Sequence, residues 1–275
     1  MSNPSPTVAV IGGSGLYQLF PPAESTVSSV HTPYGTVRVT IGTFAGTHVA
    51  FITRHGSDHS VPPHLINYRA NIWALASLGV RVILSSSAVG GLGADYPPGT
   101  LVLTDQFIDR TWGRADTFFD QGSVQHLASA DPFDTRLHGL ALDALEAAGE
   151  TVAASGTVVV IQGPRFSTRA ESRWFSAAGG DIVNMTMYPE VSLASELNLA
   201  TVNLAFVTDS DAGAHETADD ADAVSHNLVL ERLVAAQPRI VAALETIVRA
   251  LPVDFAAECM PLEAVAEILA RPAAS

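Results

Sequence analysis

Short apolar runs alternate with segments of helical spacing along most of the chain. The run Thr7–Ile11 has no polar face, which is typical of a strand buried on both sides. Further apolar runs predict strands at Val37–Ile41, Val49–Thr53, Val80–Ser85, Leu101–Leu103, Thr157–Ile161, Ile182–Asn184 and Thr201–Thr208. Helical patterns occupy Asn67–Leu78, Arg136–Ala148, Arg169–Ala178 and Ser192–Asn198. This alternation predicts an α/β fold with a central mixed β-sheet flanked by helices, mixed because the strands near Val37 and Val49 look like a hairpin.

The C-terminal part of the chain has a different pattern. Apolar residues at helical spacing predict a long helix over Ala221–Leu251, and a last helix is expected at Pro261–Ala270. No Pro/Ser-rich linker and no internal repeat divides the sequence. We therefore predict one domain over residues 1–275, with a core from about 7 to 251 and a helical extension over 252–275. Loops are expected at Pro21–Ser29, His55–Leu65, Gly91–Thr100, Thr111–Ser129 and Asp211–Ala223.

Composition narrows the classes of function. Of the 275 residues, 47% are hydrophobic and 15% charged, which excludes a disordered chain. The 28 acidic and 14 basic residues give a net charge of −14, which disfavours nucleic acid and anionic membranes as partners. No stretch approaches 18 uninterrupted apolar residues. The single cysteine, Cys259, cannot form an internal disulfide, and we recognise no secretory or transit segment in Met1–Thr7, so a cytoplasmic location is expected.

Small polar residues and glycines follow three of the predicted strands. Gly12–Gly15 would let backbone amides approach an anion, with the Ser14 hydroxyl as a further donor. Arg54 stands at a strand end and suits a bidentate grip on phosphate. Ser85–Gly91 adds further hydroxyls. Each cluster alone fits a tight turn or a surface salt bridge equally well, but ligands of α/β sheets bind outside the carboxyl ends of strands, so together they predict a small anion site.

Two further polar clusters follow strands nearer the C-terminus. Asn184-Met185-Thr186 could bind sugar hydroxyls or phosphate, or could cap a helix. Glu190, which follows, could brace an arginine or accept a hydrogen bond from a hydroxyl. Thr208-Asp209-Ser210-Asp211 carries two carboxylates, and close carboxylates raise each other's proton affinity, which suits a proton donor. A helix cap followed by a solvated acidic loop fits that pattern as well. A metal site with His215 is a weaker alternative, and we predict no metal.

Seven motifs occur in a characteristic order along the chain: Ile11–Gly15, Arg54–Gly56, Asn67–Leu75, Asp105–Thr111, Gly163–Glu171, Asn184–Thr186 and Thr208–Asp211. In this order they resemble the trimeric purine nucleoside phosphorylase family, and within it the methylthioadenosine phosphorylases. The similarity runs from about Val8 to Leu251. The resemblance implies phosphorolysis of 5′-methylthioadenosine to adenine and the pentose 1-phosphate. It also implies inorganic phosphate as co-substrate, no metal, no organic cofactor and a homotrimer.

The same resemblance implies a role for individual residues. The expected phosphate ligands are Ser14, Arg54, His55 (mainly through its backbone amide), Ser87 and Thr186. The expected nucleoside-binding residues are Ala88, Phe166, Ser167, Asn184, Met185, His226 and Val229, together with His126, which would reach the 5′ pocket of a neighbouring subunit. Asp209 and Asp211 would be catalytic and face N7 and the 6-amino group of the purine, with Asp209 as the proton donor to N7.

Two positions bear on substrate choice. The 6-oxopurine enzymes carry a Glu where Ser167 stands, so Ser167 with the two aspartates favours adenine, whose 6-amino group needs an acceptor. His226 replaces an expected apolar residue in the 5′ pocket, which leaves adenosine or another 5′-substituted adenosine open. The alternatives are a 6-oxopurine nucleoside phosphorylase, a metal-dependent nucleoside hydrolase and a nucleoside-binding protein without turnover.

Overall fold

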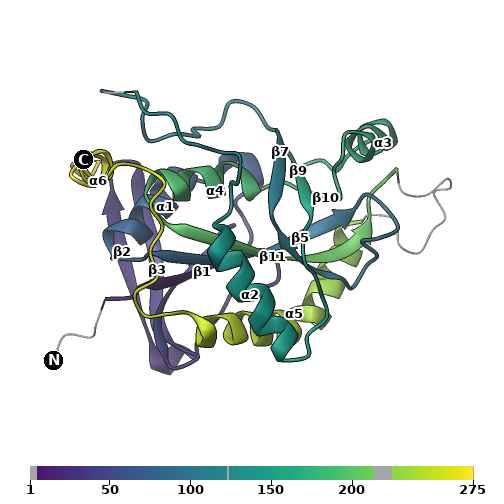
Figure 1. Ribbon diagram of the computed structural model, residues 1–275, viewed down its shortest axis with the longest axis horizontal. Helices are drawn as coiled ribbons and strands as arrows, with labels where there is room; N and C mark the ends of the chain where they lie inside the picture. Colours follow the sequence, from purple (N-terminus) through teal and green to yellow (C-terminus); the bar gives the residue numbers. More distant parts are fainter. Residues whose placement is uncertain (1–4, 123, 214–224, 275) are drawn as a thin grey trace.

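The computed structural model describes residues 5–122, 124–213 and 225–274, and a mixed β-sheet of eleven strands forms its centre (Figure 1). The strands are β1 Val8–Gly12, β2 Ser25–Thr32, β3 Gly35–Phe44, β4 Thr47–Thr53, β5 Val82–Gly91, β6 Leu101–Thr104, β7 Gln106–Arg110, β8 Val152–Ala153, β9 Thr157–Ile161, β10 Ile182–Asn184 and β11 Ala200–Ser210. The helices are α1 Tyr68–Ser77, α2 Thr135–Ala147, α3 Arg169–Ala177, α4 Met187–Glu196, α5 His226–Ala250 and α6 Leu262–Leu269.

The sheet is mixed in the way the hydrophobic pattern predicts. Its main path runs β2-β3-β4-β1-β5-β10-β9-β7, and β11, β6 and β8 branch from β5. β1 pairs in parallel with β4 and β5, whereas β3 and β4 form the expected antiparallel hairpin. The α/β fold class with a central mixed sheet and flanking helices is therefore confirmed.

β5 is the branch point of the sheet, and this position creates an opening. Residues 82–85 of β5 pair with β1, whereas Gly90 and Gly91 pair with β10. β11 follows β5 along 82–91 on its other side. Residues 86–89 therefore lie where β1 and β10 diverge, and neither strand covers this stretch. Such a fork between strands is where open α/β sheets bind their ligands.

Helices cover both faces of the sheet. α2 and α5 lie on one face, and α1 and α4 lie on the other (Figure 1). Along β1, Val8 and Val10 join the first core while Ala9 and Ile11 join the second. Successive strand residues point to opposite faces, so a strand covered on both sides needs apolar residues throughout. This explains the unbroken apolar run at the start of the chain.

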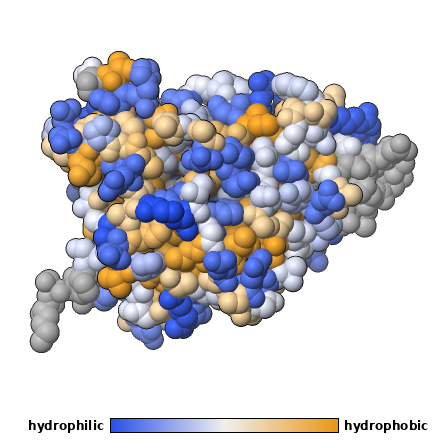
Figure 2. Space-filling view, viewed as in Figure 1, coloured by the Kyte–Doolittle hydropathy of each residue, from blue (hydrophilic) through white to orange (hydrophobic). Residues whose placement is uncertain are grey.

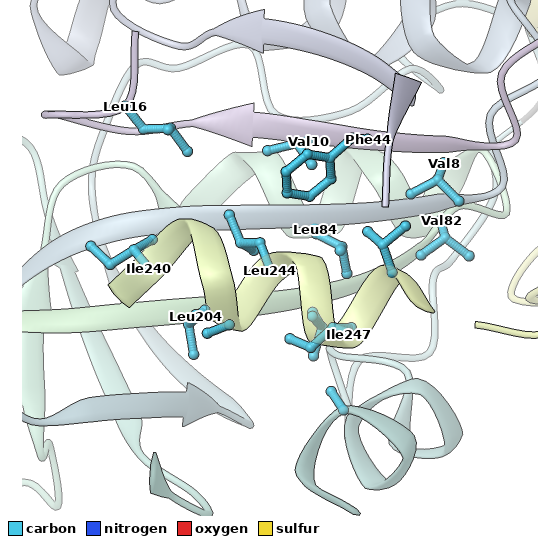
Figure 3. Packing of buried hydrophobic residues seen from close by; sticks show 14 of the residues in the cluster. Val8, Val10, Leu16, Phe44, Val82, Leu84, Leu204, Ile240, Leu244 and Ile247 are labelled. Carbon is cyan, nitrogen blue, oxygen red and sulfur yellow. The ribbon is translucent and has the colours of Figure 1, made fainter. Parts of the chain in front are cut away.

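α5 presents one apolar stripe to the sheet. Ile240, Leu244 and Ile247 are spaced four and three residues apart and pack beside Leu84 and Leu204 (Figure 3). Each of these side chains is almost completely buried. Burial of a Leu or Ile side chain stabilises a fold by about 1.5–3 kcal/mol. The helix thus anchors the strands whose polar ends form the site.

Several elements differ from the sequence prediction. β2 begins within the predicted loop Pro21–Ser29, because it is an edge strand with a largely exposed, polar sequence and no clear apolar face. The half-exposed β7 and the two-residue β8 were not predicted for the same reason. β5 and β11 continue beyond Ser85 and Thr208, where strand ends were predicted. α4 begins at Met187 rather than Ser192, and the predicted helix start at Ala221 lies outside the described residues.

The face seen in Figure 2 mixes hydrophilic and hydrophobic residues. Large exposed apolar side chains include Leu65, Trp112 and Trp174, and such residues are ordinary on protein surfaces when they are scattered. Within residues 5–122, 124–213 and 225–274, no helix combines the length and apolarity that crossing a bilayer requires.

Candidate active site

A cavity of about 450 Å³ opens at the fork of β5. Its walls come from the ends of β4, β10 and β11, from the segment 55–65, and from the start of α5. The sequence-predicted residues that line it are Ser14, Arg54, His55, Ser87, Ala88, Phe166, Ser167, Asn184, Met185, Thr186, Asp209, Asp211 and Val229. The fold thus gathers side chains that lie more than 200 residues apart in the sequence.

Two predicted residues are not placed on this cavity. His126 is exposed in the segment between β7 and α2 and does not belong to the wall of the cavity of its own chain. His226 is the first residue of α5, and its side chain lies outside the described residues. The roles expected for these two histidines therefore stay predictions.

One end of the cavity is organised around Arg54. Its Nε donates to Glu190 Oε2 at 2.6 Å, its Nη2 donates to Glu190 Oε1 at 2.7 Å, and its Nη1 donates to Ser86 O at 2.9 Å. Both side chains of this ion pair are almost fully buried. Burial alone would lower the pKa of Arg54, but Glu190 raises it above its usual value, so the guanidinium stays charged. Glu190, on α4, is the carboxylate brace that the sequence suggested.

The glycine turn after β1 packs closely against this arginine. A Cβ atom on Gly13 would lie 2.5 Å from Ser86 O and 2.9 Å from Arg54 Nη1, so only glycine fits there. The Gly13 amide donates to Ser86 Oγ at 3.2 Å. In the described part of the chain, the hydrogen bonds of Arg54 to Glu190 and Ser86 engage three of its five N–H donors and leave two for a ligand.

His55 adds a neutral imidazole beside Arg54. Burial and the neighbouring Arg54 charge lower the pKa of His55 to about 4. Its Nδ1 lies 3.0 Å from Val61 O and therefore carries the proton that this hydrogen bond needs. The ring packs on His59, at 4.7 Å between centroids, and the Tyr17 hydroxyl lies 3.2 Å from His59 Nδ1. The histidine thus holds the segment 55–65 in shape without adding a charge.

A buried amide, not predicted from the sequence, organises the hydroxyls of β5. Ser87 Oγ donates to Asn203 Oδ1 at 3.1 Å, and Asn203 Nδ2 donates to Ser85 Oγ at 2.8 Å. Asn203 is buried in β11, and its one signal in the sequence is an amide inside the apolar run Val202–Val207. The Ser87 hydroxyl proton is engaged by Asn203, so this hydroxyl must turn before it can donate to a ligand.

The opposite end of the cavity is acidic. Thr208 Oγ1 donates to Asp209 Oδ1 at 2.6 Å. The pairing of β11 with β5 shifts register between Val207 and Asp209, and such an irregularity changes the direction of the side chains at the strand end. A Cβ atom on Gly90 would lie 3.2 Å from Asp209 Oδ2 and 3.4 Å from the Asp211 side chain. Both carboxylates therefore flank the same glycine of β5, and both line the same cavity.

Asp211 has a perturbed proton affinity. Burial raises the pKa of its carboxyl group, and the hydroxyl groups of Ser172 and Ser167 offset part of that rise. Ser172, on α3, was not predicted from the sequence. Among the described residues, Ser167 Oγ, Asp211 Oδ2 and Asn184 Nδ2 have no hydrogen-bond partner of good geometry. Buried polar atoms without partners are costly, so a ligand with matching donors and acceptors is expected here.

No three His, Cys, Asp or Glu side chains in the described ranges group in a way that could hold a metal ion. His215, named for a possible metal site, and the acidic loop residues Glu216, Asp219, Asp220 and Asp222, which the hydrolase alternative would use, lie in the stretch 214–224 outside those ranges.

Comparisons with known proteins give the family. The model of the phosphorylase superfamily matches residues 7–249. The S-methyl-5′-thioadenosine phosphorylase of Thermofilum pendens is 50% identical over 214 residues, which are 76% of this chain and 80% of that protein. The purine nucleoside phosphorylase of Streptomyces coelicolor is 44% identical over 262 residues, 92% of this chain and 91% of that protein. A solved variant of the adenosine/methylthioadenosine phosphorylase of Schistosoma mansoni, in complex with adenine, superposes with a TM-score of 0.82 at 36% identity and covers 89% of this chain and 90% of its own. The protein is thus a member of the phosphorylase superfamily, in agreement with the resemblance of its motifs.

Proposed function

We propose that this enzyme catalyses the phosphorolysis of 5′-methylthioadenosine. Inorganic phosphate attacks the anomeric carbon, the bond to the purine breaks, and the products are adenine and the pentose 1-phosphate. The observation that carries the proposal is one cavity with a buried arginine and hydroxyls at one end and two carboxylates at the other. The names of its relatives, and the adenine bound to the Schistosoma protein, support the same reaction.

At the Arg54 end, the proposed task is to hold the phosphate dianion against the sugar. Arg54 supplies a fixed positive charge, Ser14, Ser87 and Thr186 supply hydroxyls, and His55 supplies its backbone amide. The transition state of such a reaction is positive at the sugar, because the bond to the base breaks before the new bond is complete. A dianion held in position stabilises that charge and then captures the carbon.

At the acidic end, the proposed task is to help the base leave. A purine departs more readily when a proton reaches N7, and Asp209 is the proposed donor. Asp211 would accept a hydrogen bond from the 6-amino group, and Ser167 would complete the edge of the base. Phe166, Ala88 and Asn184 would border the purine and the sugar.

The proposal extends to the 5′ group and to the assembly. Met185 would meet the ribose, and Val229 would contact the 5′ substituent. His226 would lie near the same substituent, so adenosine or another 5′-substituted adenosine is a further candidate substrate. We also propose a cytoplasmic homotrimer that needs no cofactor besides inorganic phosphate. In this trimer the exposed His126 would reach the 5′ pocket of the neighbouring subunit.

A preference for 6-oxopurine nucleosides is the second candidate. It is favoured by the 44% identity to a purine nucleoside phosphorylase over 92% of the chain. The serine at position 167, where 6-oxopurine enzymes carry a glutamate, weighs against it. Parallel assays with inosine and methylthioadenosine separate the two candidates, because the proposed adenine site should discriminate by orders of magnitude.

The first test is adenine release from methylthioadenosine by the purified enzyme, with phosphate and after rigorous removal of phosphate. Release that requires phosphate is the expected result. Release without phosphate, abolished by a chelator, would instead establish a metal-dependent hydrolase. Binding without release would indicate a nucleoside-binding protein, or a 5′ pocket that selects another nucleoside.

A further inference from the structure

Arg114 lies between β7 and α2, and its guanidinium group is surrounded by oxygen atoms of the backbone. It donates to Met185 O at 2.9 Å and to Gln162 O at 3.0 Å, and it also donates to Tyr188 O. The Gln162 side-chain oxygen lies 3.3 Å from its Nε, and the guanidinium group stacks over the Tyr68 ring at 5.5 Å. In the described part of the chain, its oxygen partners are carbonyls and a hydroxyl rather than carboxylates.

Some of these carbonyl groups belong to residues at the wall of the cavity. β9 and β10 run in parallel with Val160 opposite Asn184, and Gln162 and Met185 follow directly after the two strands. Met185 lines the cavity, and so does Ile161, whose carbonyl oxygen lies 3.4 Å from Arg114. Arg114 therefore joins the backbone of the two strand ends, and two of the residues whose carbonyl groups it contacts, Ile161 and Met185, line the cavity.

Met185 is confined on its other side as well. A Cβ atom on Gly163 would lie 2.6 Å from Met185 Sδ, so the turn after β9 packs directly on this side chain. The backbone of Met185 is held by Arg114, and its sulfur is held by Gly163. A shift at the Arg114 anchor would move the methionine in the cavity. A displacement of about 1 Å can cost an enzyme 10²-fold in rate when it misplaces the substrate.

The same segment has other anchors that do not reach the cavity. Glu196 accepts from Thr117 Oγ1 at 2.7 Å and from the Phe118 amide at 2.6 Å. Arg69, on α1, pairs with Asp120 and stacks over Tyr34. Arg69 is therefore a matched control, because it fixes the same segment with a guanidinium group through Asp120 and Tyr34, and neither of these two residues lines the cavity.

We propose that Arg114 is a positioning residue of the phosphorolysis reaction, and that it acts by fixing Met185 against the sugar of the nucleoside. The proposal rests on the proposed function. It assigns to Arg114 no contact with the substrate. Arg69 also fixes the segment between β7 and α2, but the proposal gives it no part in positioning Met185.

The kinetic test compares Arg114→Ala with Arg69→Ala. We expect kcat/KM for methylthioadenosine to fall at least about 30-fold in the first variant and less than about 3-fold in the second, on the scale by which misplacement slows enzymes. Guanidinium ion added to Arg114→Ala should restore part of the loss. Equal losses in the two variants, or no recovery with guanidinium, would overturn the proposal. Should Arg114→Ala fail to fold, Arg114→Lys takes its place, with a smaller loss expected.

A second readout needs no substrate. Amide hydrogen exchange of residues 158–165 and 183–189 should be faster in the Arg114 variant and unchanged in Arg69→Ala. Unchanged exchange in both variants would overturn the positioning role, whatever the kinetics. A wild-type enzyme that releases no adenine would overturn the proposed function instead, while the exchange data would still decide whether Arg114 fixes this backbone.

Discussion

The Arg54 end and the Asp211 end of the cavity differ in how far the protein satisfies its own polar groups. At the Arg54 end, a buried carboxylate and a carbonyl oxygen hold the guanidinium group, with three hydrogen bonds between 2.6 and 2.9 Å. At the Asp211 end, Ser167 Oγ and Asp211 Oδ2 have no hydrogen-bond partner of good geometry among the described residues, and burial raises the pKa of Asp211. At the Arg54 end the charge is thus held in place with two N–H donors left for an anion, whereas at the Asp211 end buried polar atoms still lack well-placed partners.

This difference assigns separate tasks to the two ends. Arg54 is already desolvated and oriented, so an anion that arrives there meets a fixed charge and loses little on ordering the site. The polar atoms at the Asp211 end stay costly until a ligand pairs with them, at about 1–3 kcal/mol for each unsatisfied group. The Arg54 end should therefore determine phosphate binding, and the Asp211 end should determine which base is accepted.

The largest effect is expected from Asp209→Asn, which breaks the acidic end. Loss of a general acid lowers kcat about 10²–10⁴-fold, because the base then leaves without a proton. The affinity for phosphate should stay within about 2-fold, since hydrogen bonds to the Arg54 end are unchanged. Steady-state kinetics with both substrates varied, and calorimetry with phosphate alone, measure the two quantities. Asp143→Asn, on the exposed face of α2, is the control. A parallel loss of phosphate affinity would contradict the division between the two ends.

The second-largest effect is expected from Glu190→Gln, which removes the carboxylate partner of Arg54. Removing one partner of a buried ion pair costs about 3–5 kcal/mol, because the remaining charge is left buried and uncompensated. The exposed pair between Arg165 and Glu171 has similar geometry, with hydrogen bonds of 2.7 Å, and gives a matched control. Glu171→Gln should cost about 0–1 kcal/mol. Denaturant unfolding measures both variants, and the phosphate KM should rise only in Glu190→Gln. Equal losses of stability would show that burial adds nothing to this pair.

Much of this comparison was accessible from the sequence. The apolar runs located β1, β4 and β9, and the resemblance placed Arg54 and Asp209 in one site. Glu190 was recognised as a possible brace for an arginine because it follows the polar residues of a strand end, although the arginine it holds is 136 positions away. The motifs are local, and local signals suffice where a strand end itself carries the chemistry.

The remainder depends on contacts between distant elements. Ser85 was predicted as a strand end because hydroxyls follow it, yet β5 continues to Gly91, since Asn203 of the neighbouring strand satisfies two of those serines. The sequence did not point to Arg114, because its partners are backbone carbonyl groups, which any residue type provides. Such residues are recognised only when the strands are in place.

The smallest effect on activity is expected from His55→Gln. If His55 meets phosphate through its backbone amide, removal of the imidazole should change the phosphate KM only about 2- to 3-fold at pH 7, since the backbone donor is retained.

The imidazole of His55 instead affects the stability of the folded protein. The pKa of His55 is about 4 in the folded protein against an ordinary value of 6.5, so between these values the unfolded chain binds more protons. The free energy of unfolding should therefore rise as the pH increases from 4 to 6.5 and then level off. In His55→Gln this part of the slope should be lost, and denaturant titrations at several pH values measure it. An unchanged slope would mean that His55 binds its proton as readily in the folded protein as in the unfolded chain, which would contradict a neutral imidazole at the Arg54 end between pH 4 and 6.5.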